Sequence, residues 1–449
     1  MEVKMKINIP PYVTAVIDRL TQNGYQAYTV GGCVRDALMG KRPHDYDVCT
    51  DCVPEEMVRI FSDFHTIETG LKHGTLTVMS EHMPVEVTTY RSDGEYTDHR
   101  RPDSVKFERE LSEDLKRRDF TVNAMCYNPD EGLVDMFDGA QDLEKGVIRC
   151  VGCAADRFEE DALRIMRALR FASTLDFEIE ADTAAAMREK SHLLAAVSAE
   201  RIFTELKKLL CGKAVRRIML DYSDLMTVII PELAPCIGCE QHNIHHCYDV
   251  YEHICRSVEY IEPDEDMRLT MLFHDIGKPR KKTTDENGID HFKLHQLASA
   301  DMAQEILLRL KSSRSTLLRV TSLIKEHDNR IPANRRSVKR FLSKYDHDFF
   351  YDWLEVRRAD TAAQSDYMMA EKMAELDKLE EIAYEIEQEN CCLKVGDLAV
   401  NGHDMMALGY QGRAIKSALE FALSAVIDEQ VENEHGALLA FIKDSFHEE

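Results

Sequence analysis

The sequence predicts an α+β protein, in which a head with a mixed or antiparallel β-sheet and helices precedes an all-α neck, body and tail. Two observations support this class. Apolar and polar residues alternate at 75–79 and 85–90, with Met83-Pro84 in the turn between them, which predicts a β-hairpin. From about residue 156 to the end, apolar residues recur at helical spacing instead.

Four parts are expected along the chain. A length of 449 residues suggests two to four domains, and the sequence pattern changes near residue 150, at the proline-bearing segment 231–235 and near residue 365. We therefore predict a head at 1–150, a helical neck at 151–230, a helical body at 231–365 and a helical tail at 366–449.

The head contains a glycine turn between a predicted strand and a predicted helix. Residues 12–22 have the pattern of an amphipathic helix, and 26–30 predict a short strand that ends at Gly31-Gly32. Two glycines after a strand and before a helix let the backbone approach a phosphate closely. Arg35 would lie on the first turn of that helix, where its guanidinium can pair with a triphosphate.

Three carboxylates are expected to converge beside this turn. Asp45 and Asp47 are two apart on the strand predicted at 45–50, so their side chains share a face. Glu86 alternates with apolar neighbours on the second strand of the hairpin and offers a third acid. Each residue alone has an ordinary explanation, as a turn or as a solvent-facing side chain. Their joint order predicts a site for two Mg²⁺ ions and in-line phosphoryl transfer.

These motifs resemble a known family. The runs GGCVRDALMGKRPHDYDVCT and RFEEDALRIMRALRFAS, with the LKRRDFTVNAM segment between them, are similar to class II tRNA nucleotidyltransferases and bacterial poly(A) polymerases. The resemblance implies that Asp45 and Asp47 bind the metal ions, with Glu86 as the third carboxylate. It further implies contacts with the nucleotide from Gly32, Arg35 and Arg118.

A second cluster in the neck is predicted to choose the base. Asp161, Arg164, Arg167 and Arg170 are three apart on a predicted helix, a spacing that also suits a solvated face with salt bridges. One carboxylate acceptor beside one guanidinium donor accepts the edges of cytosine and adenine and rejects those of guanine and uracil. Glu-Asp-x-x-Arg at 160–164 resembles the base-reading motif of the family, which leaves Arg167 and Arg170 to face phosphates.

The body has the ligands of a second metal centre. An adjacent His-Asp pair in LFHDIGKP, an earlier histidine and a distant aspartate resemble the HD phosphohydrolase superfamily. That resemblance assigns a divalent metal to four residues: His253, His274, Asp275 and Asp360. His295 and His327 are candidates for a second metal or a phosphate, and a mixed His/carboxylate set suits Mn, Fe, Ni or Mg. Whether this site is active stays open at the level of sequence.

The expected activity is addition or repair of the CCA end of tRNA from CTP and ATP, without a nucleic-acid template. Residues 90–113 resemble an intact flexible loop that enzymes adding only CC lack, and the tail resembles a tRNA-binding region. Three alternatives remain: addition of A alone or of poly(A), an HD phosphohydrolase as the main activity, and a non-catalytic RNA-binding protein.

Net charge limits how such a protein holds RNA. A formal charge of −25 is opposite to that of a bulk RNA binder, so basic residues must gather locally. Two runs qualify: Lys207, Lys208, Lys213, Arg216 and Arg217, and then Arg335, Arg336, Lys339 and Arg340. The absence of an apolar signal or membrane-length segment predicts a cytoplasmic protein without a membrane partner, with its 13 cysteines reduced. The sequence does not give the oligomeric state.

Overall fold

The computed structural model describes residues 7–93 and 105–446, which form two compact units. The residues assigned to unit 1 are Met1–Pro231 and Arg309–Ser312, and those assigned to unit 2 are Glu232–Leu308 and Ser313–Glu449. A mixed sheet in unit 1 and a preponderance of helices confirm the predicted α+β class. The division into four domains stays a prediction.

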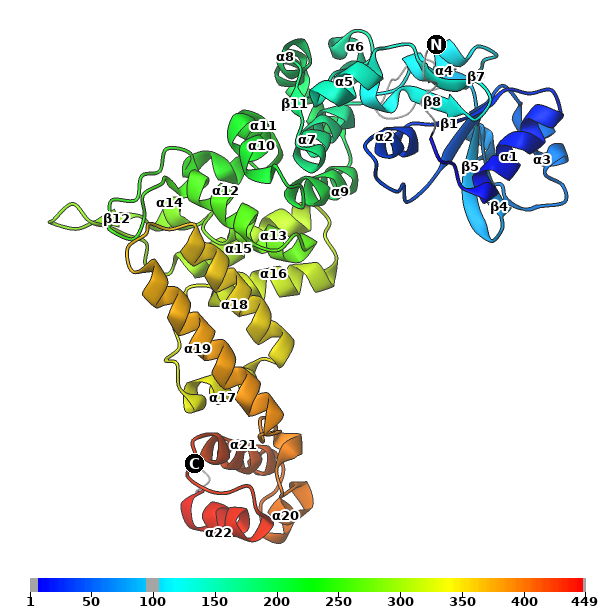
Figure 1. Cartoon of the computed structure of the whole chain (residues 1–449). Helices are drawn as coiled ribbons and strands as arrows, with labels where there is room; N and C mark the ends of the chain where they lie inside the picture. The colour runs from blue at the N-terminus through cyan, green and yellow to red at the C-terminus, as the bar shows by residue number, and fades with distance from the viewer. Residues whose placement is uncertain (1–6, 94–104, 447–449) are drawn as a thin grey trace. The chain divides into compact units, whose positions relative to one another are not determined.

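A seven-stranded sheet in the order β3-β4-β5-β2-β1-β8-β9 runs through the N-terminal part of unit 1 (Figure 1). Its strands are β1 (Ala27–Val30), β2 (Asp47–Thr50), β3 (His65–Ile67), β4 (Thr75–Ser80), β5 (Met83–Thr89), β8 (Met125–Asn128) and β9 (Gly132–Asp135). The β2–β5 pair is parallel, whereas the other neighbours are antiparallel. Two-stranded pairs are formed by β6 (Arg91–Asp93) with β7 (Val105–Phe107) and by β10 (Val147–Ile148) with β11 (Glu178–Ile179).

Each face of this sheet has its own apolar cluster. Val48 and Val87 point into the larger cluster, which includes residues of the helices α1 (Pro11–Gln22), α2 (Gly32–Leu38) and α3 (Pro54–Ile60). Cys49 points the opposite way, into a smaller cluster closed by Leu111 and Leu115 of α4 (Leu111–Lys116). Successive side chains of a strand alternate between faces, so Asp47 shares the face of Cys49 and α4.

Two local predictions in the head are wrong in detail. The strand predicted at 45–50 begins at Asp47, so Asp45 lies in the preceding loop. The hairpin itself forms, but its turn is Glu81-His82, with φ of 49° and 64°, rather than Met83-Pro84. Two residues with positive φ match the twist of antiparallel strands, and this turn shifts Met83 and Pro84 into β5.

The remaining helices of unit 1 include a break in the neck. They are α5 (Gly139–Lys145), α6 (Ala154–Glu160), α7 (Leu163–Leu175), α8 (Ala181–Lys190), α9 (Ala199–Leu210), α10 (Val215–Asp221) and α11 (Ser223–Ile229), with short 3₁₀ segments at Leu71–His73, Thr121–Asn123 and Ser191–Ala196. Asp161 has extended backbone angles (φ −140°, ψ 101°) between α6 and α7. The prediction that Asp161 shares one helix with Arg164 is therefore wrong, because the helix ends before it.

Unit 2 is a helical body followed by a helical tail. In the body, α12 (Val250–Tyr260), α13 (Glu265–Phe273), α16 (Arg314–Glu326) and α18 (His347–Ala362) pack together. The other body and junction elements are α14 (Lys278–Lys281), β12 (Thr283–Thr284), β13 (Asp290–His291), α15 (His295–Arg309), α17 (Arg335–Lys344) and α19 (Met369–Gln388), plus a 3₁₀ segment at Pro231–Cys236.

A separate apolar cluster stabilises the tail. Its elements are a 3₁₀ segment at Val395–Asp397, α20 (Gly402–Ala407), α21 (Arg413–Ile427) and α22 (His435–Ser445). Met405, Ala418, Leu438 and Ile442 are fully buried in this cluster. Among the helices that the structure describes, none is both long and apolar enough to cross a lipid bilayer.

We predict that Gly277→Ala destabilises unit 2 by about 1–3 kcal/mol, because the body has no room there for a methyl group. A Cβ atom at Gly277 would lie 2.6 Å from the backbone nitrogen of Ser299 and 2.9 Å from the carbonyl oxygen of His295. Urea unfolding followed by fluorescence of Trp353, the only tryptophan, measures this loss. Gly436→Ala is the control, since a Cβ there meets no atom within 4 Å. Equal midpoints for both variants would contradict the prediction.

Candidate functional site

The predicted carboxylates of the head lie at the start of β2. Asp47 is its first residue and pairs in parallel register with Glu86 of β5. Asp45 precedes it by two residues, and all three residues are exposed to solvent. The sheet therefore brings Asp47 and Glu86 side by side, and the loop before β2 adds the carboxylate of Asp45 nearby.

The electrostatics of Asp47 indicate crowding of negative charge. Desolvation by the surrounding protein and repulsion from Glu86 raise the pKa of Asp47 from 3.8 to about 6, and Asp45 adds to the rise, while Arg118 opposes it. A cation placed among these oxygens would relieve the repulsion. Carboxylate oxygens are the ligands preferred by hard divalent cations, so the donor set suits Mg²⁺.

The glycine turn and Arg118 adjoin this group. Gly31 has a φ of 84°, and a Cβ atom on it would lie 3.1 Å from Nη1 of Arg118. The same guanidinium donates to Oδ2 of the buried Asp114 at 3.2 Å, and Asp47 acts on it electrostatically. Gly32 then opens α2. Arg118 thus lies beside the predicted phosphate-approach turn, and Asp114 fixes its orientation.

Arg35 belongs to a buried polar network that the sequence interpretation missed. Its Nη1 donates to Oδ1 of Asn123 at 2.7 Å, and its Nε donates to Oδ1 of Asp36 at 2.9 Å. Asn123 in turn donates to Oδ1 of Asp119 at 3.2 Å. The Arg35 guanidinium also lies 5.1 Å from the ring centroid of Phe171 on α7. The network joins the helix after the glycine turn to the neck.

The two arginines expected to face phosphates are both paired with acids. Arg167 donates from Nε to Oδ2 of Asp119 at 2.7 Å. Burial alone would raise the pKa of Asp119, but the charge and hydrogen bond of Arg167 outweigh it and lower that pKa to about 2. Arg170 forms an ion pair with Glu205 and lies 3.8 Å from the ring centroid of Phe171. Both arginines therefore have structural partners within unit 1.

The predicted base-reading pair is held by other partners. Arg201 of α9 donates from Nη2 to Oδ2 of Asp161 at 2.8 Å. Arg164 donates to Oε2 of Glu160 at 2.6 Å and to the carbonyl oxygen of Arg117 at 2.8 Å. Arg201 lies 40 residues from Asp161 in sequence, so no local pattern marks it as a partner. The reading of a base by Asp161 and Arg164 stays a prediction.

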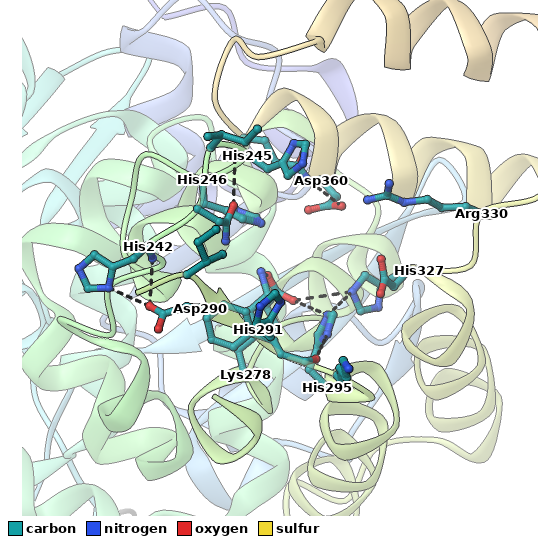
Figure 2. A pocket seen from close by; sticks show the side chains of 18 of the residues that line it. His242, His245, His246, Lys278, Asp290, His291, His295, His327, Arg330 and Asp360 are labelled. Carbon is teal, nitrogen blue, oxygen red and sulfur yellow. Dashed lines mark hydrogen bonds and ion pairs between the residues drawn. The ribbon is translucent and has the colours of Figure 1, made fainter. Parts of the chain in front are cut away.

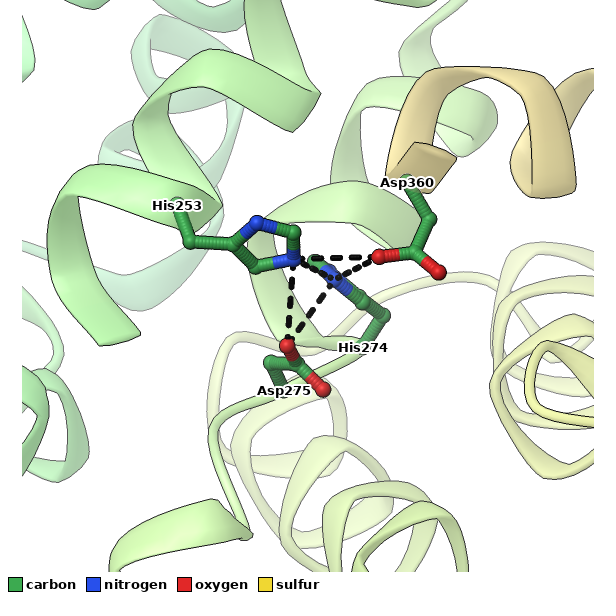
Figure 3. A group of neighbouring side chains, drawn as sticks. All are labelled: His253, His274, Asp275 and Asp360. Atoms are coloured by element: carbon green, nitrogen blue, oxygen red, sulfur yellow. Dashed lines mark hydrogen bonds and ion pairs between the residues drawn. The ribbon is translucent and has the colours of Figure 1, made fainter. Parts of the chain in front are cut away.

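Unit 2 brings the predicted metal ligands of the body together (Figure 3). His253 comes from α12, the adjacent His274 and Asp275 follow α13, and Asp360 comes from α18. All four are buried, and their ligand atoms lie within 4.8 Å of one another. A second group with the same spacing consists of Asp275, His295 and His327. We call these six residues the His/Asp centre.

Backbone carbonyl groups orient the four imidazoles of this centre. Each Nδ1 faces one such oxygen: His253 faces Ala363 at 3.1 Å, His274 faces Met271 at 2.7 Å, His295 faces Phe292 at 2.9 Å and His327 faces Ile324 at 2.7 Å. A carbonyl oxygen accepts only, so Nδ1 carries the proton and a neutral ring presents a lone pair at Nε2. Those Nε2 atoms meet in pairs at 3.1 and 3.2 Å, so a proton on one ring or a metal cation must separate the two lone pairs.

Asp275 is shared by both pairs of imidazoles. Its Oδ2 lies 3.2 Å from Nε2 of His253 and 3.3 Å from that of His274, whereas its Oδ1 lies 3.1 Å from Nε2 of His295. Burial lowers the pKa of His253, but hydrogen bonds with Asp275 and Asp360 outweigh it and raise that pKa to about 9. The centre therefore attracts cations, and each oxygen of Asp275 serves one group of ligands.

A cavity of about 880 Å³ opens over the His/Asp centre (Figure 2). Part of its lining comes from residues 242–246 and from the β12–β13 hairpin. The buried Asp290 joins them, because its Oδ2 accepts from the backbone nitrogen of His242 at 3.0 Å and forms an ion pair with Lys282 at 2.8 Å. His246 and Lys278 also line the cavity, and neither was predicted.

The basic residues of the second run, on α17, form ion pairs within unit 2. Arg336 and Arg340 each donate from Nη2 to Oδ2 of Asp428 at 2.7 Å. Arg335 and Lys339 pair with glutamates of the same unit. This part of α17 fastens the body to the tail, so its charge is less available to RNA phosphates than the sequence suggests.

Three family profiles match successive parts of the chain. The poly A polymerase head domain matches residues 27–149, and a profile described as a probable RNA and SrmB-binding site of polymerase A matches 176–237. A profile described as a putative tRNA nucleotidyltransferase domain 2 matches 283–442. His253, His274 and Asp275 lie between the second and third matched segments.

Similar proteins extend over the whole chain. The CCA-adding enzyme of Lactiplantibacillus plantarum is 32% identical over 438 residues, which cover 95% of this chain and 94% of that enzyme. The CCA-adding enzyme of Lactococcus lactis subsp. cremoris is 53% identical over 204 residues, 45% of this chain, and the match spans about half (50%) of that relative.

Solved structures share the fold over nearly the full length. The Bacillus stearothermophilus CCA-adding enzyme in complex with CTP aligns with a TM-score of 0.68 and 27% identity, covering 97% of this chain and 98% of that one. The Thermotoga maritima CCA-adding enzyme complexed with tRNA aligns with a TM-score of 0.61 at 19% identity, covering 99% and 100%, and supports the fold alone.

We predict that Asp47→Asn stabilises the metal-free protein at pH 7.5, raising the unfolding midpoint by about 1–3 °C. The folded-state pKa of about 6 lies above the ordinary 3.8. The contribution of Asp47 to stability is therefore full below pH 3.8 and is lost as pH rises through 6, whereas asparagine does not ionise. Thermal scans with a chelator at pH 4 and 7.5 measure the difference.

Asp18→Asn on the exposed face of α1 is the matched control and should leave the midpoint unchanged at both pH values. A gain from Asp47→Asn of equal size at pH 4 and 7.5 would show that ionisation of Asp47 is not its cause.

Proposed function

The chain belongs to the family of CCA-adding enzymes, and from this membership we propose that it adds or repairs the 3′-terminal CCA of tRNA from CTP and ATP. A nucleotidyltransferase of this family uses a divalent metal, and we propose Mg²⁺ in the head. The observation that carries the proposal is the parallel register of Asp47 and Glu86, with Asp45 nearby and the glycine turn beside Arg118.

The proposed reaction is attack of the tRNA 3′-hydroxyl on the α-phosphate of CTP or ATP, with pyrophosphate leaving. Asp45, Asp47 and Glu86 would hold two Mg²⁺ ions, which when bound acidify the hydroxyl and neutralise charge on the leaving group. Gly32 leaves room for the triphosphate at the start of α2, and Arg118 supplies a fixed positive charge beside Asp47. The chain's own residues would thus position the substrates and neutralise negative charge, and none would form a covalent intermediate.

For base choice we propose that Asp161 and Arg164 read cytosine and adenine. Asp161 accepts from Arg201 and from the backbone nitrogen of Leu163, and a carboxylate has about four acceptor sites, so it retains capacity for an exocyclic amino group. Arg201 would orient that carboxylate. We propose that Arg167 and Arg170 support this helix through Asp119 and Glu205 rather than by facing phosphates alone.

The test uses three tRNA transcripts that end before CCA, after C and after CC, each with Mg²⁺ and CTP, ATP or both. We expect C, C and A to be added in order, followed by a stop, as resolved at single-nucleotide resolution. Extension of only the CC-ended transcript, and only by A, would identify an A-adding enzyme instead. Untemplated runs of A would identify a poly(A) polymerase.

The matched variant pair for this assay is Asp47→Asn and Asp18→Asn. Removing a metal-binding carboxylate should lower the rate at least about 100-fold, whereas the control on α1 should retain full activity. The loop at 90–113 was the reason to expect that the chain does not stop at CC, and its segment 94–104 lies outside the described residues. Accumulation of a CC-ended product with both nucleotides present would show that the chain adds CC only.

We also propose a second activity, metal-dependent phosphohydrolysis at the His/Asp centre. The supporting observation is the convergence of four buried Nε2 atoms on the two oxygens of Asp275, a ligand set that suits two divalent cations such as Mn, Fe, Ni or Mg. Bound metals would supply an activated water molecule and polarise a phosphate. Lys278, whose Nζ lies 2.6 Å from Oδ2 of Asp275, would balance charge beside the site.

For this centre we predict about two divalent ions per chain by elemental mass spectrometry after loading with Mn²⁺. Asp275→Asn should lose most of both ions, because that residue serves both groups, whereas His295→Ala should lose about one. Hydrolysis of nucleoside 2′,3′-cyclic phosphates and p-nitrophenyl phosphate should fall with the metal content, while CCA addition persists.

Asp301→Asn, on the exposed face of α15, is the control and should bind both ions. Wild-type protein without bound metal and without hydrolysis would refute the second activity and leave the first intact.

A further inference from the structure

One side of the cavity above the His/Asp centre carries a concentration of positive charge. Arg330 lines both this cavity and a smaller adjoining one of about 50 Å³, which Arg357 and Lys372 also line. Figure 2 shows Arg330 extending towards Asp360 at the rim of the centre. We call Arg330, Arg357 and Lys372 the cationic wall.

Hydrogen bonds link this wall to the metal-ligand set. Gln364 donates from Nε2 to Oδ2 of Asp360 at 3.1 Å, and Nζ of Lys372 donates to Oε1 of Gln364 at 2.8 Å. The ammonium group of Lys372 is therefore two hydrogen bonds from a residue of the His/Asp centre. Arg357 donates from Nη1 to the carbonyl oxygen of His327 at 2.8 Å, and its buried Nε meets no acceptor among the residues that the structure describes.

The charge of this wall is not neutralised by ion pairs. Within residues 7–93 and 105–446, neither Arg330 nor Lys372 forms a salt bridge with a carboxylate. Asp360, Asp328 and Glu375 act on Arg357 through their charge. Burial lowers the pKa of Lys372, and the neighbouring Arg330 and Arg357 lower it further, against the opposing charge of Asp360. Carboxylates act on these cations from nearby, but none in the described part of the chain pairs directly with Arg330 or Lys372, which leaves both groups able to bind an anion.

We propose that the cationic wall binds a second phosphate of the substrate, the internucleotide diester next to a terminal phosphate placed at the His/Asp centre. The substrate class is then an RNA 3′ end that carries a phosphate, not a free mononucleotide. This rests on the proposed phosphohydrolase activity. The volume of about 880 Å³ far exceeds one phosphate, and the exposed Ile289 with Phe292 offers apolar surface for a base.

The test compares two substrates of Mn²⁺-loaded enzyme, the dinucleotide UpUp, with a diester and a 3′-phosphate, and uridine 3′-phosphate, which has no diester. We expect kcat/KM for UpUp to be at least about tenfold higher, because a charged hydrogen bond to the diester adds binding. Arg330→Ala and Lys372→Ala should each remove most of this preference, because they raise KM for UpUp about tenfold more than KM for uridine 3′-phosphate. Lys325→Ala, a lysine on the exposed face of α16, is the matched control.

A binding measurement separates this inference from the activity on which it rests. Labelled UpUp is titrated into metal-free protein at increasing salt, and both wall variants should bind about tenfold more weakly with a shallower salt dependence. Full-strength binding by the variants, or an equal loss for both substrates, would overturn the second-phosphate site. A preference for uridine diphosphate over UpUp would overturn the assignment to an RNA diester. Absence of hydrolysis with intact wall-dependent binding would refute only the activity.

Discussion

The parallel pairing of β2 with β5 is the constraint on which the head depends. It sets Asp47 directly beside Glu86 on one face while Val48 and Val87 enter the core on the other. A shift of the register by one residue would exchange these faces, burying carboxylates and exposing valines. The apolar cluster therefore holds the acids together, although desolvation and repulsion from Glu86 raise the pKa of Asp47. The packing of the sheet offsets the electrostatic cost of holding these carboxylates together.

Sequence patterns were sufficient for features with local periodicity. The α+β class and the hairpin follow from alternation along strands. The expectation that Glu86 lies near Asp47 rested on the order of the motifs and on the family resemblance, because alternation does not show which strands are neighbours. The residues that meet in unit 2 were likewise expected from the resemblance to the HD superfamily. The patterns failed where one backbone angle or a distant partner decides the outcome. The extended backbone of Asp161 ends a helix that periodicity alone would continue. Arg201 reaches it from another helix, a contact that no spacing encodes.

Many basic residues of this chain form ion pairs with its own acidic residues. The arginines of α7 and the basic run of α17 are tied to Asp119, Glu205 and Asp428, so a count of basic residues overstates the charge open to nucleic acid. The cationic wall is different, since Arg330 and Lys372 have no carboxylate partner among the described residues. Basic residues without a carboxylate partner therefore indicate a binding site better than a high number of basic residues does.

The shared acid at the junction of α17 and α21 has an evolutionary consequence. Arg336 and Arg340 are one helical turn apart and both pair with Asp428, so either arginine can be substituted while the other keeps an ion pair between α17 and the end of α21. Asp428 has no such substitute, because its loss leaves two guanidinium groups facing each other. Tolerance to substitution is therefore unequal across this contact. Among descendants of this sequence, the aspartate should persist longer than either of its two partners.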